Sequence, residues 1–252
     1  MIDLHCHILP GIDDGPRTWE ESLQMARVAY QDGITTIVAT PHIDDGIYEV
    51  QRSQILDRTY EFSSLLKKEN INIKVLPGAS IHIQEGLVEG LKNGDLMTLN
   101  DTGKYVLLEL PHECVPDITD LIFRLQIAGI KPIIAHPERN LEIQQSPYIL
   151  DGLSERGCLF QTTAASFLGD FGPRAKKCAK DLLRQGDGML FVATDAHSAT
   201  KRPPKLSAAL KKMVNMSFYY IDALAFVLEY PQAVIEGKEI RRNEEAIVRN
   251  TY

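Results

Sequence analysis

Seven short runs of β-branched and aliphatic residues alternate with longer amphipathic stretches along this chain. We expect strands over Ile2–His5, Thr35–Ala39, Ile73–Leu76 extending toward Ile83, Tyr105–Glu109, Pro132–His136, Cys158–Thr162 and Met189–Ala193. The first intervening stretch, TWEESLQMARVAYQDG, has Thr18 and Glu21 at capping-box spacing and ends at Gly33, which is typical of a helix. Strands that alternate with helices pair in parallel through right-handed crossovers, so the sequence predicts an α/β fold of seven βα units.

Two architectures arrange such units, an open doubly wound sheet and a closed barrel. A nucleotide-binding open sheet carries a glycine-rich turn after its first strand, and the segment HCHILPGIDDGP has no such fingerprint. No linker rich in glycine and serine divides the 252 residues. Barrels of this length fold as one unit. We therefore expect a single domain over residues 1–252, built as a barrel of seven units.

Ionisable residues follow the carboxyl ends of five of the seven expected strands. They are His5 and His7 after the first, His42 after the second, Glu109 after the fourth, His136 after the fifth, and Asp195 and His197 after the seventh. One such residue alone is usually a hydrogen-bonded or helix-capping side chain. Their repetition favours a metal site, because α/β barrels build their active sites at this face. Imidazole with carboxylate suits zinc, manganese or iron, and the number of donors indicates two or three ions.

The spacing of these residues also indicates a substrate class. His5 and His7 lie two apart on a strand, so they point to the same side and can share one ion. Metal clusters of this kind bind oxyanions and lower the pKa of bound water to make hydroxide. Arg139 and Arg202 follow the ligand segments closely. An arginine beside a polymetal site holds phosphate oxygens through paired hydrogen bonds. The alternative interpretation of Arg139, and of Arg202, is an ordinary surface arginine.

Charge and cysteine content exclude several other classes of protein. The net charge is −7 with a pI near 5.5, which argues against nucleic acid or an anionic membrane as partner. The four cysteines show no CxxC spacing, so reduced thiols are expected. We see no signal peptide and no apolar stretch near the roughly 20 residues of a membrane helix. These features predict a cytoplasmic protein without membrane insertion.

The motifs MIDLHCHILPGIDDGP, ATPH, LLELP, AHPERN and ATDAHSATKRPP together resemble the PHP (polymerase and histidinol phosphatase) superfamily. They are most similar to its bacterial protein-tyrosine phosphatases of capsule and exopolysaccharide operons, as is the segment QTTAASFLGDFG. The resemblance runs from Met1 to about Pro204, and YPQAVIEGK is similar to the closing helix of that family. It implies a distorted (β/α)7 TIM-like barrel, the PHP fold. It also implies two or three divalent ions, usually manganese, with iron or zinc as alternatives.

The resemblance implies roles for individual residues. By motif, one ion would be bound by His5, His7 and Asp195, a second by Glu109 and His136, and a third by Asp14, His42 and His197. Arg139 and Arg202 would hold the phosphate, and Asp14 or His42 would assist the leaving group. The implied substrate is phosphotyrosine on the tail of a bacterial tyrosine autokinase that regulates capsular and exopolysaccharide synthesis. A phenolate leaving group, with a pKa of ~10, needs less proton assistance than an alkoxide.

Ser80 departs from the family pattern, in which the third strand carries a glutamate as G-x-E. This chain reads PGASIHI there. A neutral hydroxyl is a poor ligand for a divalent metal, so the site holds fewer or weaker ions, another group compensates, or activity is reduced. Strand alternation places His82 on the same side as Ser80, which makes His82 a candidate substitute, with simple lining of the pocket as the alternative.

Three other interpretations stay open. The chain could be a PHP phosphoesterase of the histidinol-phosphate type, acting on a small phosphorylated molecule. It could also be a metal-binding regulator of the kinase, catalytically weakened by the change at Ser80. Cys178 and Arg184 match the C-x5-R spacing of cysteine-dependent tyrosine phosphatases, but RAKKCAKDLLRQG is typical of an amphipathic helix rather than of a phosphate loop.

Overall fold

The computed structural model describes residues 1–44, 46–185, 190–216 and 223–240. Its strands are β1 (Ile2–Cys6), β2 (Thr36–Ala39), β3 (His42–Ile43), β4 (Lys74–Pro77), β5 (Ser80–His82), β6 (Tyr105–Glu109), β7 (Lys131–Ala135), β8 (Leu159–Thr163) and β9 (Leu190–Ala193). Its α-helices are α1 (Trp19–Gln31), α2 (Arg52–Lys68), α3 (Leu87–Asn93), α4 (Thr119–Ile127), α5 (Leu141–Gln145), α6 (Tyr148–Glu155), α7 (Ala164–Leu168), α8 (Gly172–Gln185), α9 (Ser207–Val214) and α11 (Tyr230–Ile235). The shorter helices are the 3-10 helices η1 (Leu99–Asp101) and η2 (Pro137–Arg139) and the π-helix η3 (Ala225–Glu229).

Every pairing between two of these strands is parallel, which confirms the predicted α/β class. One sheet has the order β1-β2-β4, and a second has the order β3-β5-β6-β7-β8-β9. Main-chain hydrogen bonds also join the end of β9 to the end of β1. The amide of Asp195 donates to the carbonyl of His5 at 2.8 Å, and the amide of His7 donates to the carbonyl of Ala196 at 2.9 Å. The last strand therefore returns to the first.

The expected third strand is divided at Gly78 and Ala79 into β4 and β5. The expected second strand, Thr35–Ala39, is present as β2, and the short strand β3 follows it after Thr40 and Pro41. Proline has no N–H for a sheet ladder. At Gly78 the side chain of Val38 packs so closely that a Cβ would lie 2.7 Å from its Cγ1. The chain passes from one sheet to the other at these points, and the sequence did not predict the change.

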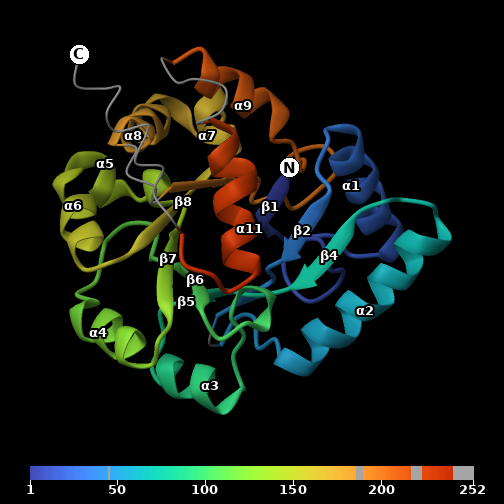
Figure 1. Ribbon diagram of the computed structural model, residues 1–252, viewed down its shortest axis with the longest axis horizontal. Coiled ribbons are helices and arrows are strands. Elements are labelled where there is room, and N and C mark those ends of the chain that lie inside the picture. The colour runs from blue at the N-terminus through green and yellow to red at the C-terminus, as the bar shows by residue number, and fades with distance from the viewer. Residues whose placement is uncertain (45, 186–189, 217–222, 241–252) are drawn as a thin grey trace.

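Helix α1 forms as its capping residues predict. The hydroxyl of Thr18 accepts a hydrogen bond from the amide of Glu21, which satisfies a donor at the amino end of the helix. The carboxylate of Glu21 accepts from the amide of Arg17 rather than from that of Thr18, so only half of the expected capping box is present. In Figure 1 the helices from α1 to α9 surround the strands.

The end of the described chain packs against the amino ends of the strands. Tyr105, the first residue of β6, donates a hydrogen bond of 2.7 Å from its hydroxyl to the carbonyl of Lys238. The side-chain amide of Asn100 donates to the carbonyl of Ile235 at 2.8 Å. Figure 1 shows α11 crossing the middle of the ring of helices. The carboxyl ends of the strands lie on the other side, where the side chains of the site gather.

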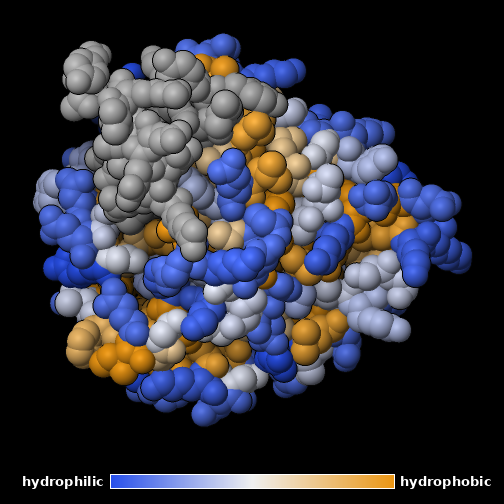
Figure 2. Space-filling view, viewed as in Figure 1, coloured by the Kyte–Doolittle hydropathy of each residue, from blue (hydrophilic) through white to orange (hydrophobic). Residues whose placement is uncertain are grey.

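The interior is apolar and the outside is mostly hydrophilic. Phe62 on α2 is fully buried and stacks on Trp19, while Phe123 and Ile127 on α4 are exposed. Figure 2 shows hydrophobic side chains at the lower left of the molecule, over α4. Among the described helices, none has both the length and the apolar character needed to cross a membrane.

Candidate active site

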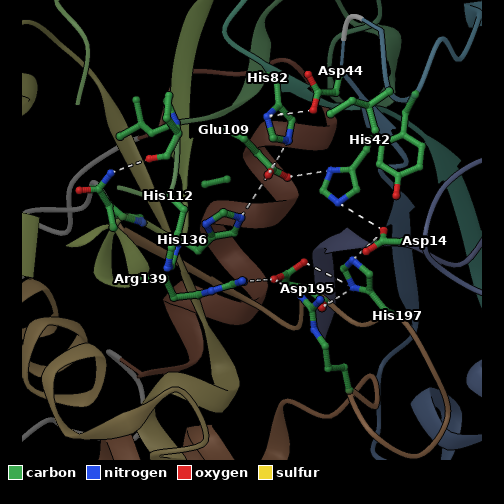
Figure 3. Close-up of a pocket in the computed structure, with 18 residues that line it drawn as sticks. Asp14, His42, Asp44, His82, Glu109, His112, His136, Arg139, Asp195 and His197 are labelled. Atoms are coloured by element: carbon green, nitrogen blue, oxygen red, sulfur yellow. Dashed lines mark hydrogen bonds and ion pairs between the residues drawn. The ribbon is translucent and has the colours of Figure 1, made fainter. Parts of the chain in front are cut away.

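A polar pocket opens at the carboxyl ends of the strands (Figure 3). It is lined by eight of the residues expected at the site: Asp14, His42, Glu109, His136, Arg139, Asp195, His197 and Arg202. The other two, His5 and His7, are fully buried and contact the same cluster. The structure thus brings together all ten residues selected from the sequence, which come from the ends of different strands and from the segments that follow them.

His5, His7 and Asp195 form the deepest part of the cluster. Nε2 of His5 lies 3.1 Å from Nε2 of His7, and each nitrogen lies 3.4 Å from Oδ1 of Asp195. Ligands held at 2.0–2.2 Å by one ion are separated by roughly 3.0–3.5 Å. Glu109 lies beside this group, with Oε1 3.9 Å from His5. These atoms have the spacing of ligands to one ion.

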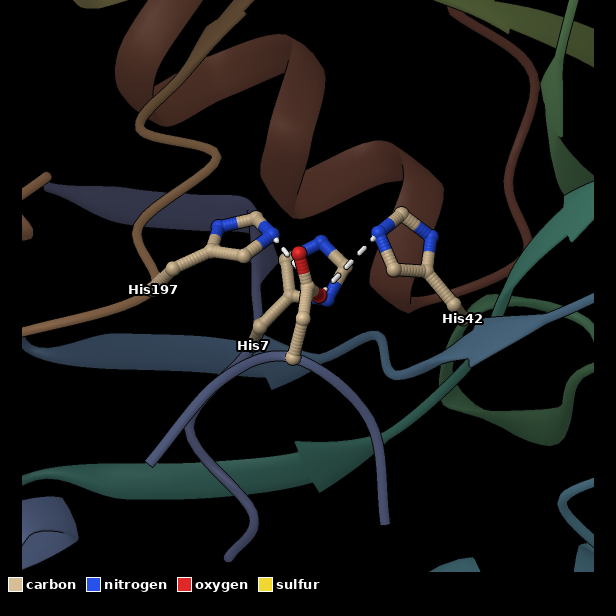
Figure 4. A group of neighbouring side chains, drawn as sticks. His7, His42 and His197 are labelled. Atoms are coloured by element: carbon tan, nitrogen blue, oxygen red, sulfur yellow. Dashed lines mark ion pairs between the residues drawn. The ribbon is translucent and has the colours of Figure 1, made fainter. Parts of the chain in front are cut away.

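A second group surrounds the carboxylate of Asp14. Oδ1 of Asp14 lies 3.3 Å from Nε2 of His197 and 3.5 Å from Nε2 of His42. One ligand atom from each of these residues and one from His7 lie within 4.8 Å of one another. Figure 4 shows the three imidazoles converging on this position. The trio expected from the resemblance is therefore assembled, and His7 adjoins it.

Glu109 is shared by several imidazoles. Its Oε1 lies 3.2 Å from Nδ1 of His42, and its Oε2 lies 3.6 Å from Nε2 of His136. Oε2 also lies 3.1 Å from Nε2 of His82. Ser80 donates a hydrogen bond of 2.5 Å from its hydroxyl to Oε1. Figure 3 shows Glu109 between His42, His82 and His136.

Two buried residues that the sequence reasoning missed orient the deepest histidines. Oδ2 of Asp13 lies 2.7 Å from Nδ1 of His7, and Oε1 of Gln161 lies 2.7 Å from Nδ1 of His5. Both oxygens accept, so each Nδ1 carries the proton and each Nε2 is directed at the cluster. Two features of the sequence pointed to them: Asp13 is an acidic neighbour of Asp14, and Gln161 is a single amide side chain within a buried strand.

The charge of the cluster favours bound cations. Burial opposes ionisation of Asp195 and Glu109, but the histidines around them hold the pKa of each carboxyl well below its usual range. Burial also opposes a charge on His7, yet its hydrogen bonds to Asp13 and Asp195 raise its pKa to about 10. Burial lowers the pKa of His5 to about 3. The same negative potential that favours a proton on His7 favours a divalent cation.

Both arginines point into the cluster. Nη1 of Arg139 and Nη2 of Arg202 each donate to Oδ2 of Asp195 at 2.5 Å, while Oδ1 of that residue faces the deep histidines. The guanidinium of Arg139 also lies 4.4 Å from the centre of the Phe171 ring, a cation–π distance. One carboxylate thus joins the candidate ligands to the candidate phosphate-binding groups.

Comparisons with known proteins show the family of this chain. Residues 1–236 match the family described as capsular polysaccharide synthesis, CpsB/CapC. The chain belongs to the CpsB/CapC family. The resemblance to the tyrosine phosphatases of capsule operons, drawn from the motifs, is confirmed.

The curated relatives of this CpsB/CapC chain are similar to it over nearly their whole length. It is 38% identical over 250 residues to the tyrosine-protein phosphatase YwqE of Bacillus subtilis, covering 99% of this chain and 94% of that protein. It is 39% identical over 250 residues to the putative tyrosine-protein phosphatase CapC of Staphylococcus aureus, covering 96% of this chain and 94% of that protein.

Solved structures give the same family and a wider fold group. One from the work on YwqE of Bacillus subtilis and CpsB of Streptococcus pneumoniae, described as unique metal-dependent tyrosine phosphatases, is 36% identical with a TM-score of 0.89. It covers 96% of this chain and 97% of its own. The lactonase Lmo2620 of Listeria monocytogenes is 13% identical over 94% of this chain and 95% of its own, with a TM-score of 0.60, and shows a shared fold only.

Two residues of the CpsB/CapC site have a strained backbone. His136 has φ of 34° and Asp195 has φ of 52°, both in the left-handed region that favours glycine. His136 directly follows the last residue of β7, and Asp195 lies two residues after the end of β9. Such strain is maintained where the surrounding structure fixes the residue for a function.

The C-x5-R segment of this CpsB/CapC chain forms no phosphate loop. Cys178 and Arg184 both lie on helix α8, as the sequence predicted. The thiol of Cys178 is buried, and burial raises its pKa to about 12. A nucleophilic cysteine needs the opposite shift and an accessible sulfur.

Proposed function

We propose that this chain is a metal-dependent protein-tyrosine phosphatase that hydrolyses phosphotyrosine. The observation that carries the proposal is the shared carboxylate of Asp195, which joins the candidate ligands His5 and His7 to Arg139 and Arg202. The names of the relatives support the same activity. Divalent ions, when bound, lower the pKa of water and withdraw charge from phosphoryl oxygens.

The residues of the chain itself bind and orient the phosphoryl group in this proposal. The N–H groups that Arg139 and Arg202 do not direct at Asp195 are available to two phosphoryl oxygens, which holds phosphorus over the cluster. Asp14 lies at the pocket wall beside His42 and His197, within reach of the departing oxygen. Either His42 or the protonated form of Asp14 would assist by donating a proton to the phenolate oxygen as its bond to phosphorus breaks.

The pocket wall also fits an aromatic leaving group. Ile47 and Tyr48 line it, and the ring of Tyr48 stacks on that of His42 with centroids 5.6 Å apart. An apolar and aromatic wall offers a flat surface for a phenyl ring. A phosphorylated serine has no ring to use this surface, which supports phosphotyrosine as the substrate.

The finer features of the proposal follow from the resemblance. We propose that the two sheets form the distorted (β/α)7 PHP barrel in one domain, and that the ligand sets are those expected above. Two or three divalent ions per chain are proposed, with manganese as the ion that the resemblance implies and iron or zinc as the alternatives. The proposed substrate is the phosphotyrosine tail of a tyrosine autokinase of capsule synthesis, and the proposed location is the cytoplasm.

The test compares two phosphate esters. The purified chain is supplied with manganese, and release of phosphate from a phosphotyrosyl peptide and from histidinol phosphate is measured. We expect a kcat/KM at least about a hundredfold higher for the peptide, because histidinol phosphate lacks the aryl leaving group. A preference for histidinol phosphate would assign the chain to small-molecule chemistry. No hydrolysis of either, with retained kinase binding, would favour a regulator weakened at Ser80.

A further inference from the structure

The strand β5 brings two side chains to the carboxylate of Glu109. In the register of β5 against β6, His82 pairs with Glu109, and Ser80 lies two residues earlier on the same side. Ser80 donates to Oε1 of Glu109, and Nε2 of His82 lies 3.1 Å from Oε2. The two oxygens of Glu109 therefore face different residues of the same strand.

Ser80 and His82 can do different things for an ion. The hydroxyl of Ser80 directs its proton at Glu109, so it acts as a neutral donor to a candidate ligand rather than as a ligand. The imidazole of His82 has a nitrogen whose lone pair can bind a metal when its other nitrogen carries the proton. Only His82 of the two offers a strong donor atom.

We propose that His82 binds, through Nε2, a divalent ion shared with Glu109 and His42. We further propose that this position prefers an ion suited to imidazole, such as zinc or iron(II), over manganese. The inference rests on the proposed function only for the presence of divalent ions in the pocket.

The donor atoms have the spacing that one ion needs. One ligand atom each from His42, His82 and Glu109 lie within 4.8 Å of one another. Nε2 of His82 lies 3.1 Å from Oε2 of Glu109, and Nδ1 of His42 lies 3.2 Å from Oε1, so an ion between the two imidazoles would be bound by both oxygens of this carboxylate. Among the described residues, buried Nδ1 of His42 makes no hydrogen bond, although it faces Oε1 of Glu109. His42 can bind this ion through Nδ1, in which case Nε2 carries the proton and the ion beside Asp14 and His197 is left to those two residues and His7.

The carboxylate of Asp44 faces His82 at the distance of an ion pair. Its Oδ2 lies 3.6 Å from Nδ1 of His82, on the side of the ring away from Glu109 (Figure 3). A carboxylate in this place favours the proton on Nδ1 and leaves Nε2 for the metal, an arrangement common behind metal-binding histidines. Asp44 is thus a positioning residue, and His82 the ligand that it orients.

The donor types determine the preferred ion. Two imidazoles and one carboxylate suit zinc, iron or nickel, whereas manganese prefers carboxylates and water. His82 is neutral as a ligand, so the position also carries one negative charge less than it would with a second carboxylate on β5. A glutamate at position 80 would restore an oxygen donor at the same edge of the sheet.

The experiment measures bound metal in the full chain. Wild-type protein and the variants His82→Gln, Ser80→Glu and Asp44→Ala are dialysed against zinc or manganese, and elemental analysis gives the number and affinity of bound ions. His112→Gln is the matched control, because His112 lines the same pocket without belonging to the candidate ligand groups in the described part of the chain.

We expect His82→Gln to lose one zinc ion per chain, or to bind it at least about tenfold more weakly, and Asp44→Ala to weaken it about tenfold. The control should match the wild type. In Ser80→Glu the ratio of zinc to manganese affinity should fall at least about tenfold. Unchanged zinc binding in both His82→Gln and Asp44→Ala would overturn the ligand assignment, and an unchanged ratio in Ser80→Glu would overturn the preference. Asp44→Ala retains every ligand, so it tests the site even if His82→Gln fails to fold.

Hydrolysis of a phosphotyrosyl peptide by the wild type is measured in parallel. Hydrolysis together with unchanged zinc binding in His82→Gln would leave the proposed function standing and refute this inference. If the wild type did not hydrolyse the peptide but His82→Gln lost a zinc ion, the inference would stand and the proposed function would be refuted.

Discussion

Asp13 accepts a hydrogen bond of 2.7 Å from Nδ1 of His7, and the same carboxylate also accepts from the amides of Gly15 and His42. One buried side chain therefore sets the ring of a candidate ligand and the loop that carries Asp14. Neither contact uses the metal-facing nitrogen of His7. Asp13 thus acts on the metal site without entering it.

Replacement of Asp13 by alanine tests this role. We expect Asp13→Ala to lower the affinity for the divalent ions about 10- to 100-fold, because His7 loses the acceptor that fixes its tautomer and orientation. The affinity is measured by titrating metal into the metal-depleted protein. Asp95→Ala, which changes an exposed aspartate on the surface, is the control. Equal metal affinity in both variants would contradict the role assigned to Asp13.

The two arginines give a second prediction. Arg139→Lys and Arg202→Lys keep the charge but lose the planar fork, and each should lower kcat/KM about 10- to 100-fold, because a charged hydrogen bond is worth ~1.5–3 kcal/mol. Inhibition by inorganic phosphate should weaken in the same variants. Arg174→Lys, on the exposed side of α8, is the matched control. An unchanged inhibition constant in Arg139→Lys and Arg202→Lys would remove both residues from phosphate binding.

Chelation separates the metal site from the cysteine motif. We expect EDTA to abolish hydrolysis and added manganese to restore it, while iodoacetamide leaves the rate unchanged. Cys178 is buried with a raised pKa, and Cys114 is the exposed cysteine of the described chain. The rates before and after each treatment are the measurement. Loss of activity on alkylation, with resistance to EDTA, would reverse the assignment.

Two aromatic residues of α2 give a prediction about stability. Phe62 is fully buried against Trp19, and Tyr60 is 79% exposed. Phe62→Ala should lower the free energy of unfolding by about 3–5 kcal/mol through the cavity it leaves, and Tyr60→Ala by less than about 0.5 kcal/mol. Urea denaturation gives both values. Similar losses in the two variants would mean that α2 does not pack as described.

The sequence predicted the strands and the donor residues because both depend on local pattern. Apolar runs give the strands, and a histidine or carboxylate at the carboxyl end of a run is visible without any fold. Tyr105–Glu109 was predicted to the residue. The passage from one sheet to the other at Pro41 and Gly78 was not predicted, because it depends on packing across the sheet, such as that of Val38 against Gly78.

The orienting residues were also out of reach of the sequence. The role of Gln161 depends on which nitrogen of His5 faces it, and that of Asp44 on the side of His82 it approaches. These relations join segments that are distant in the chain, or depend on the direction of a ring. His82 was recognised as a candidate only because strand alternation places it beside Ser80.

The pairing of β5 with β6 has an evolutionary consequence. Positions 80 and 82 both reach the carboxylate of Glu109, so a ligand can move from one to the other by point substitution, without an insertion and without a new backbone conformation. Related proteins that descend from one ancestor can in this way exchange one metal ion for another while keeping the same reaction. Metal choice in such a lineage would then follow the availability of metals in each organism's habitat.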